Sequence, residues 1–352
     1  MSSGYRVVQW TDFKKSYDLA LALGVLGFLG AYVATALVWL TPAQQLAPPQ
    51  LLIRALGSCA FALLTLVLAI GPLARLSPRF LPLLYNRRHM GLTCFLLSAL
   101  HAVVVLVWYH GFGEINPLVS LLVSNPRYDA IGGFPFESLG LLALLMLFVL
   151  AATSHDFWNA TLGPRMWKAI HMGIYGAYAL LVAHVMLGAV QGGKSPLFAF
   201  AVAAGAGLVA ALHIIVGRRE LRRDADLPAP ADGWLPVGPA LSIVDGCARI
   251  VTPPVGERIA VFRQANEIFA VSNVCRHQGG PLGEGRIVDG CITCPWHGYQ
   301  YRPQDGHSPA PFTEKIATYR TRIRGGSVYV QAQSAGLGQP VPPSRIDQQE
   351  AR

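Results

Sequence analysis

The chain has 352 residues, of which 53% are hydrophobic and only 13% charged, and its formal net charge is +9. A soluble globular domain carries about 25% charged residues, so this composition excludes a disordered or nucleic-acid-binding tail protein and disfavours a purely soluble enzyme. Residues 1–216 hold 18 charged residues among 216, about 8%, whereas residues 217–352 hold 29 among 136, about 21%. The sequence therefore predicts a membrane domain followed by a water-soluble domain.

Six long apolar runs in the first part each approach the roughly 20 residues that a helix needs to cross a bilayer. The first run is too long for a cleaved signal peptide, and charged residues precede it. We therefore expect residues 1–216 to form an all-α bundle of six helices in the lipid bilayer. The runs are 19–40, 51–71, 90–109, 137–154, 167–189 and 196–216.

Basic residues flank these runs unevenly. Thirteen Lys and Arg residues lie on one set of flanks, whereas the opposite loops hold only Arg127 and Lys194, with Arg54 near a helix end. By the positive-inside rule, we expect a multi-pass protein of the cell (inner) membrane with both termini and everything after residue 217 in the cytoplasm. Orientation thus explains much of the net charge, and nucleic acid is discounted as a partner.

Three histidines lie inside the expected spans, where ionisable residues are costly and mark candidate functional sites. His101 lies in the third run, and His171 and His184 lie about 20 Å apart along the fifth. A porphyrin held between two helices needs one axial imidazole from each, and His101 with either fifth-run histidine meets that requirement. Hydrogen bonding between helices is the alternative. The other membrane-domain histidines, which we expect to be interfacial groups, are His89, His110, His155 and His213.

The order of the six runs resembles the ferric reductase-like transmembrane domain over about residues 20–216. The segments that carry the resemblance are Arg87-Arg88-His89-Met90-Gly91-Leu92, His101, and Trp167-Lys168-Ala169-Ile170-His171 followed by His184. The resemblance implies b-type haem and electron transfer across the membrane. Its oxidase-type members have two third-run histidines spaced like the fifth-run pair. Here His89 and His101 are 12 residues apart and His171 and His184 are 13 apart, so we expect one haem rather than two.

The second part begins with a charged helix end and a Pro/Ala linker over residues 217–232. Short strand-like runs follow, separated by Gly, Pro, Asn and Asp, which is typical of a small β-sandwich or barrel. We expect one all-β domain over 233–334 and a disordered, Gly/Pro/Gln-rich tail over 335–352. The expected strands are 248–251, 258–263, 268–272, 287–293, 316–323 and 327–331.

Two short motifs in this domain each offer a thiolate and an imidazole. They are Cys275-Arg276-His277 and Cys294-Pro295-Trp296-His297, and 16 residues separate them. Two thiolates suit one iron of a [2Fe-2S] cluster and two imidazoles suit the other. Zinc also accepts two Cys and two His, but these spacings are not those of zinc fingers and the context is β-rich. A cytoplasmic location disfavours a disulfide.

This pattern resembles the Rieske family over about residues 233–334, which implies that Cys275, His277, Cys294 and His297 are the cluster ligands. Rieske proteins of quinol-oxidising cytochrome complexes have an additional Cys in each cluster loop, and neither loop has one here. We expect Cys247 and Cys291 to be ordinary buried thiols.

The residues around the second motif bear on the cluster subtype. Tyr299 replaces the Ser that hydrogen-bonds a sulfide in the high-potential type, although Tyr301 could still donate. Fewer donors lower the reduction potential. The resemblance therefore implies the ferredoxin and oxygenase type, of low to intermediate potential.

No flavin or nicotinamide module and no two-His-one-carboxylate iron domain is visible in the sequence. We therefore expect an electron-transfer oxidoreductase with no catalytic residues of its own. A cytoplasmic flavin reductase or ferredoxin would donate single electrons to the cluster, and a redox partner beyond the membrane would receive them from the haem. Two alternatives stay open: a terminal reductase of ferric chelates, oxygen or quinone at the haem, and a redox sensor that does not turn over.

Overall fold

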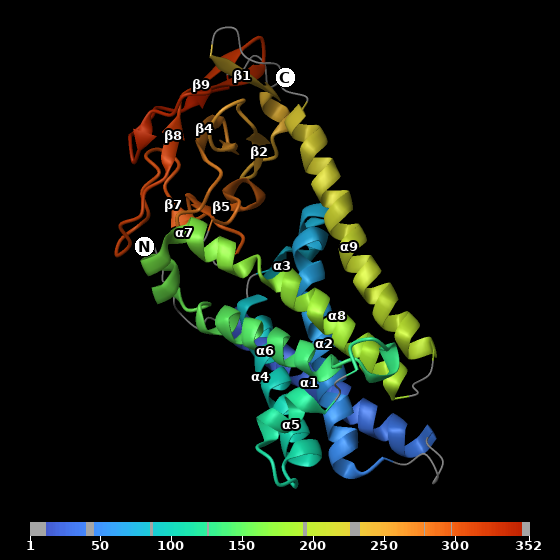
Figure 1. The fold of residues 1–352 in the computed structure, drawn as a ribbon. Coiled ribbons are helices and arrows are strands. Elements are labelled where there is room, and N and C mark those ends of the chain that lie inside the picture. Colours follow the sequence, from blue (N-terminus) through green and yellow to red (C-terminus); the bar gives the residue numbers. More distant parts are fainter. Residues whose placement is uncertain are drawn as a thin grey trace. The chain divides into compact units, whose positions relative to one another are not determined.

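The computed structural model describes most of the chain, which divides into two compact units (Figure 1). One unit comprises Trp10–Ala74 and Asn86–Ile214, and the other includes Arg75–Tyr85 and Ile215–Arg352. The described residues are 12–39, 46–84, 87–124, 127–192, 196–225, 233–277, 279–296 and 298–346.

Among the described residues, five helical spans are long and apolar enough to cross a membrane, with mean hydropathies from 1.6 to 2.3. They coincide with five of the six expected runs and support a multi-pass membrane protein. The fourth run forms α6 (Phe136–Ala152), an apolar helix of 17 residues, so the sixth crossing stays a prediction. The five spans are Lys14–Val38, Pro48–Leu76, Arg87–His110, Met166–Ala189 and Phe198–Arg219.

Short turns separate the helices. Proline stands at the start of α2 and of α5, where its missing N–H costs no hydrogen bond, and Asn116 caps α5 by accepting from Leu118 N. The longer helices are α1 (Asp12–Trp39), α2 (Pro48–Leu76), α4 (Arg87–Val105), α7 (Asp156–His171), α8 (Ile174–Gln191) and α9 (Pro196–Ala225). The shorter ones are η2 (Pro78–Phe80), α3 (Leu81–Leu84), the π-helix η3 (Leu106–His110), α5 (Pro117–Val123) and η4 (Ile131–Gly133).

The fifth expected run is divided between two helices. α7 ends at His171 and α8 begins at Ile174, because Gly173, a poor helix former, takes part in a turn in which its N–H donates to Ile170 O at 2.9 Å. α8 then packs beside α6 (Figure 1), and Leu147, Leu150 and Ala177 are buried between them. This packing positions His184 on α8.

In the part of the second unit that the structure describes, the strands form three antiparallel sheets. Their orders are β1-β10-β9, β11-β8-β4-β3-β2 with β12 beside β4, and β5-β6-β7. The first six strands are β1 (Trp234–Pro239), β2 (Ala248–Val251), β3 (Ile259–Gln264), β4 (Glu267–Ser272), β5 (Arg286–Val288) and β6 (Cys291–Thr293). The others are β7 (Gln300–Tyr301), β8 (Ala317–Tyr319), β9 (Thr321–Arg324), β10 (Ser327–Gln331), β11 (Gly336–Leu337) and β12 (Ser344–Arg345). Short 3-10 turns, η5 (Ala240–Ser242) and η6 (Leu282–Glu284), connect them.

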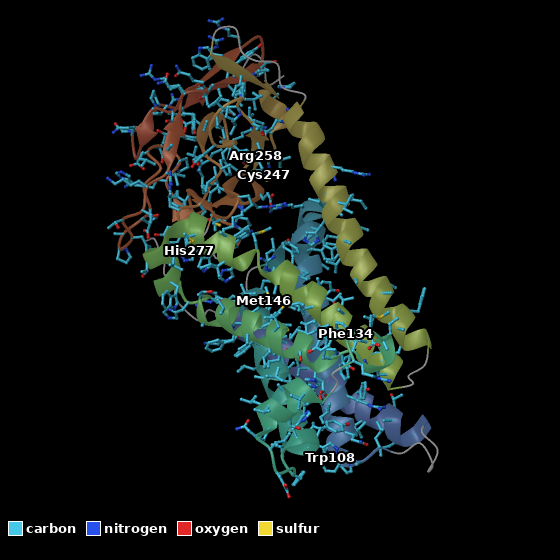
Figure 2. The ribbon with its side chains drawn as sticks, viewed as in Figure 1. Trp108, Phe134, Met146, Cys247, Arg258 and His277 are labelled. Atoms are coloured by element: carbon cyan, nitrogen blue, oxygen red, sulfur yellow. The ribbon has the colours of Figure 1, made fainter. Side chains whose placement is uncertain are left out.

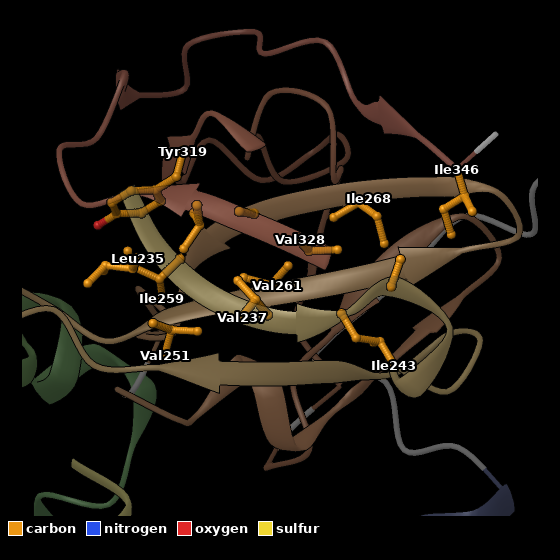
Figure 3. Close-up of a cluster of buried hydrophobic side chains, with 13 residues drawn as sticks. Leu235, Val237, Ile243, Val251, Ile259, Val261, Ile268, Tyr319, Val328 and Ile346 are labelled. Atoms are coloured by element: carbon orange, nitrogen blue, oxygen red, sulfur yellow. The ribbon is translucent and has the colours of Figure 1, made fainter. Parts of the chain in front are cut away.

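Two apolar cores support this unit. The first lies between β1, β3 and β10, where Leu235, Val261 and Val328 are fully buried (Figure 3). Burying such a side chain stabilises the fold by about 1.5–3 kcal/mol. The second core includes Phe262, Ile292 and both motif cysteines. The cysteines are therefore fixed by the same packing that holds the sheets together.

The structure differs from the expected strands at several places. The expected strand 316–323 is divided between β8 and β9, which belong to different sheets, and the sequence did not predict β1 or β7. The run 287–293 is a hairpin of β5 and β6, because Asp289 and Gly290 both take positive φ (51° and 75°), as a tight two-residue turn requires. The tail expected to be disordered from residue 335 is ordered as far as Ile346. There β11 pairs with β8, β12 pairs with β4, and Ile346 is 4% exposed in the first core. Residues 347–352 lie outside the described part.

Candidate metal centres

The two cysteine motifs form loops with the same backbone pattern. Each Cys N–H donates to a carbonyl five residues later, and each Cys carbonyl accepts from a glycine four residues later. Both glycines have φ of 72°, which L side chains rarely adopt. The bonds, 2.7–2.9 Å long, are Cys275 N to Gly280 O, Gly279 N to Cys275 O, Cys294 N to Tyr299 O and Gly298 N to Cys294 O.

The thiols of Cys275 and Cys294 are both 1% exposed and lie close together at the base of these loops. A Cβ on Gly280 would come within 2.7 Å of Cys294 Sγ, so the first loop approaches the second thiol only because it has glycine there. Burial opposes ionisation of Cys275, but hydrogen bonds from the Cys294 and Tyr301 side chains and the His277 backbone, together with the His277 charge, lower the pKa of its thiol below the usual range. The thiolate is the form that binds metal.

Tyr301 contacts the first motif directly. Its hydroxyl oxygen lies 3.5 Å from Cys275 Sγ and accepts from Arg276 N at 3.0 Å. With Arg276 N–H as its donor, the hydroxyl has its own hydrogen to give to the sulfur. The sequence did not decide whether Tyr301 donates a hydrogen bond, and in the structure its hydroxyl lies within reach of Cys275 Sγ.

His277 lies against Tyr299, with ring centroids 5.2 Å apart and the ring planes inclined by 11°. Its Nδ1 atom is buried although the residue is partly exposed, so the nitrogen nearer the backbone faces inward. Cys275 and Cys294 lie together in the second core, and His277 stacks on Tyr299 of that core. The described residues hold no group of three His, Cys, Asp or Glu side chains arranged around a single metal ion. His297, the fourth predicted ligand, lies outside the described residues.

Tyr299 is 2% exposed, and its hydroxyl donates to the Glu314 carboxylate. Burial and then this hydrogen bond raise the pKa of the phenol above its usual range. The side chain at the position of the high-potential Ser is therefore engaged with Glu314.

The two other cysteines of the domain do not join the motifs. Cys247 precedes β2 and lies away from His277 (Figure 2), and Cys291 begins β6. Both are only half-buried, whereas the sequence predicted buried thiols. Burial raises the pKa of Cys291, which disfavours its thiolate.

In the helical unit, His101 on α4 faces His184 on α8. Their ring centroids are 6.5 Å apart and their planes are inclined by 84°. Nδ1 of His101 donates to Ile53 O at 2.9 Å, and Nδ1 of His184 donates to Phe136 O at 2.8 Å. These bonds place the ring proton on Nδ1 in each case, so Nε2 carries the lone pair that a metal requires.

The surroundings of these two histidines repeat. Each imidazole donates to a carbonyl 48 residues earlier, and each lies against a glycine one helical turn after that carbonyl. A Cβ on Gly57 would come within 3.0 Å of the His101 ring, and a Cβ on Gly140 within 2.8 Å of the His184 ring. Neither glycine was among the predicted site residues, although the shared 48-residue offset and the four-residue step are visible in the sequence.

His171 ends α7, and its ring stacks on Trp167 with centroids 3.8 Å apart. Its Nδ1 donates to Trp167 O at 3.0 Å, and its Nε2 is buried without a hydrogen bond in the described part of the chain. His171 therefore also has a constrained tautomer. It is His184, however, that the structure places against His101.

Two of the histidines expected at interfaces have polar partners, since His89 pairs with Asp18 at 2.8 Å and His213 with Tyr175 at 3.0 Å. His155 is exposed. His110 differs from the expectation, because it is only 6% exposed.

Family models match both halves of the chain. The model described as Rieske [2Fe-2S] domain matches residues 233–320, and the model described as ferric reductase like transmembrane component matches residues 56–182.

Curated relatives match one half or the other. The anthranilate 1,2-dioxygenase ferredoxin subunit of Burkholderia cepacia is 41% identical over 73 residues, which are 20% of this chain and 68% of that protein. The protein-methionine-sulfoxide reductase heme-binding subunit MsrQ of Bordetella pertussis is 30% identical over 138 residues, 39% of this chain and 61% of that protein. Cholesterol 7-desaturase of Hemicentrotus pulcherrimus is 34% identical over 101 residues, 28% of this chain and 21% of that protein.

Proposed function

Since the chain belongs to the Rieske [2Fe-2S] family through its C-terminal domain and carries a ferric reductase-like transmembrane component before it, we propose that it relays single electrons across a membrane. The electrons come from a cytoplasmic donor, a flavin reductase or a ferredoxin, and leave to an acceptor on the far side. The protein lies in the inner membrane with both termini and the Rieske domain in the cytoplasm. Its domains are 1–216 and 233–334, extended to Ile346 by the ordered tail.

The observation that carries the proposal is the facing pair His101 and His184. Two metal–nitrogen bonds of about 2 Å each, together with the distance from each nitrogen to its ring centre, span about 6 Å. The centroids are 6.5 Å apart, so His101 and His184 would be able to hold between them a haem, the group that the Bordetella relative is named for binding. His171 remains the candidate for a ligand nearer the other end of the unit.

The Rieske residues fit their cluster in the same way. Cys275 and Cys294 supply two buried thiols, and His277 presents a buried Nδ1 beside them. We infer that His297 completes the set as the second imidazole. When bound, the [2Fe-2S] cluster and the haem each take up and release a single electron.

The residues of the chain hold these groups and keep water away from them. The Ile53 and Phe136 carbonyls fix the two haem-facing imidazoles. The glycine-closed loops hold the thiols in an apolar core, and Tyr301 directs a hydrogen bond at Cys275. Such fixed ligands limit the rearrangement that accompanies a change of charge.

The test is purification of the full-length chain with spectroscopy of each metal centre. We expect a b-type haem spectrum and a Rieske electron paramagnetic resonance signal. His184→Ala should abolish at least the haem bound at His101 and leave the cluster signal intact. Cys294→Ala should abolish the cluster signal and leave the haem spectrum intact. The control is His213→Ala, another histidine of a membrane helix, which should retain both signals.

If His101→Ala or His184→Ala retained the full haem content, that result would contradict the ligand assignment. Reconstituted vesicles then test the direction of electron flow. A reduced flavin reductase or ferredoxin outside inverted vesicles should reduce the haem, and this reduction should depend on the cluster. Haem reduction that persists in Cys294→Ala would contradict the proposed route.

A further inference from the structure

A buried imidazole lies at the end of the helix that carries His101. His110 is the last residue of η3, one turn of π-helix that continues α4. Such turns are rare in proteins, and those that occur often lie at functional sites. Its Nδ1 lies 2.9 Å from Ser120 Oγ on α5. Its Nε2 is buried and makes no hydrogen bond to any described residue. The His110 ring is thus held at Nδ1 by Ser120, and its Nε2 has no hydrogen-bonding partner among the described residues.

The unused nitrogen faces a carboxylate. Glu137 Oε2 lies 3.7 Å from His110 Nε2, and the Glu137 side chain is 17% exposed. Ser124 Oγ donates to the same oxygen at 2.8 Å. Glu137 stands in the first turn of α6, where the helix dipole favours negative charge.

The other ionisable side chains between α4 and α6, and near this end of α2, do not contact the pair in the described part of the chain. They are Arg54, Tyr109, Glu114, Arg127, Tyr128 and Asp129, and none forms an ion pair or hydrogen bond with His110 or Glu137 there. From α5 the pair meets only the hydroxyl of Ser120, and from the residue after α5 the hydroxyl of Ser124. In the described part of the chain, the Ser120 and Ser124 hydroxyls are therefore the side-chain hydrogen-bonding partners of the pair.

This pair is one residue away from the support of a haem-facing histidine. Glu137 follows Phe136 in the chain. The Phe136 carbonyl accepts a hydrogen bond from His184 Nδ1 at 2.8 Å, and the centroids of the Phe136 and His184 rings are 5.5 Å apart. Charges interact strongly in a medium of low dielectric. A change of charge at the metal and a change of protonation at the pair must therefore influence each other.

We propose that His110 and Glu137 form a proton-binding site that is coupled to the electron on the haem held by His101 and His184. The proposal rests on the proposed function. When one electron reaches the haem, His110 Nε2 binds one proton from water and directs it toward the Glu137 carboxylate. When the electron leaves, His110 returns that proton to water. One negative and one positive charge thus enter and leave together, and the unit avoids an uncompensated buried charge.

The experiment measures the midpoint potential of the haem against pH in the purified full-length protein. The signal is the haem absorbance that is present in the wild type and absent from His184→Ala. For one proton per electron, the wild-type potential should fall by up to 59 mV for each tenfold decrease in proton concentration. Glu137→Gln and His110→Gln should reduce this slope to less than half. Both variants should keep the haem, because neither residue is proposed as a ligand.

The matched control is Asp18→Asn, which removes the carboxylate of another histidine–carboxylate pair in the same unit, Asp18 with His89. It should leave the slope at the wild-type value. A wild-type potential that does not change with pH overturns the proposal, even if His110→Gln fails to fold. A Glu137→Gln slope equal to that of the wild type also overturns it. Absence of haem from the wild type would instead overturn the proposed function.

Discussion

At the scale of single residues, the Tyr301 hydroxyl distinguishes this cluster site from one with no side-chain donor. It lies 3.5 Å from Cys275 Sγ, and a hydrogen bond to a charged group contributes about 1.5–3 kcal/mol. Since a donor favours the more negative, reduced cluster, Tyr301→Phe should lower the cluster potential. For a one-electron couple we expect a change on the order of tens of millivolts.

Redox titration of the cluster signal measures this shift. Tyr319→Phe is the control, because Tyr319 is also a buried tyrosine but packs in the first core, away from the thiols. It should leave the potential unchanged. An unaltered potential in Tyr301→Phe would show that the hydroxyl does not stabilise the reduced cluster.

At the scale of helices, two glycines make room for the facing imidazoles. Gly140→Ala would bring a Cβ within 2.8 Å of the His184 ring, so the ring must move and weaken its bond to Phe136 O. We expect the variant to bind less haem or to show a shifted haem spectrum. Gly91→Ala on α4 is the control, because a Cβ there meets nothing within 4 Å. Equal haem content and identical spectra for the two variants would contradict this role of Gly140.

Local patterns predicted most of these elements, and long-range pairing accounts for the rest. Apolar length indicated five of the helical spans, and the two Cys-His motifs indicated the Rieske domain, whose family model matches. The ferric reductase-like resemblance is confirmed in the same way. The division of the fifth run at Gly173 depends on one residue, which hydropathy averages out. β11 and β12 have two residues each and exist only because β8 and β4 are beside them, so no periodicity could reveal them.

The candidate sites show the same limit. The choice of His184 as the partner of His101 depends on how α4 and α8 pack, and helix periodicity alone left it open. The burial of His110 depends on a π-helical turn and on Ser120 from a neighbouring helix. Its position near the end of an apolar run favoured an interfacial group, and tertiary packing overrode that expectation.

At the scale of the whole molecule, the β-rich C-terminal part has apolar cores of its own. A fragment of residues 233–352 contains both cysteine loops and both β cores, so we expect it to be soluble and to show the Rieske signal without the helices.

Ending the fragment at residue 334 removes β12 and the buried Ile346. Loss of a buried Ile side chain alone costs about 2–5 kcal/mol. Thermal unfolding should therefore show a lower midpoint for 233–334 than for 233–346, which serves as the control. Equal midpoints would mean that the tail adds nothing to the domain.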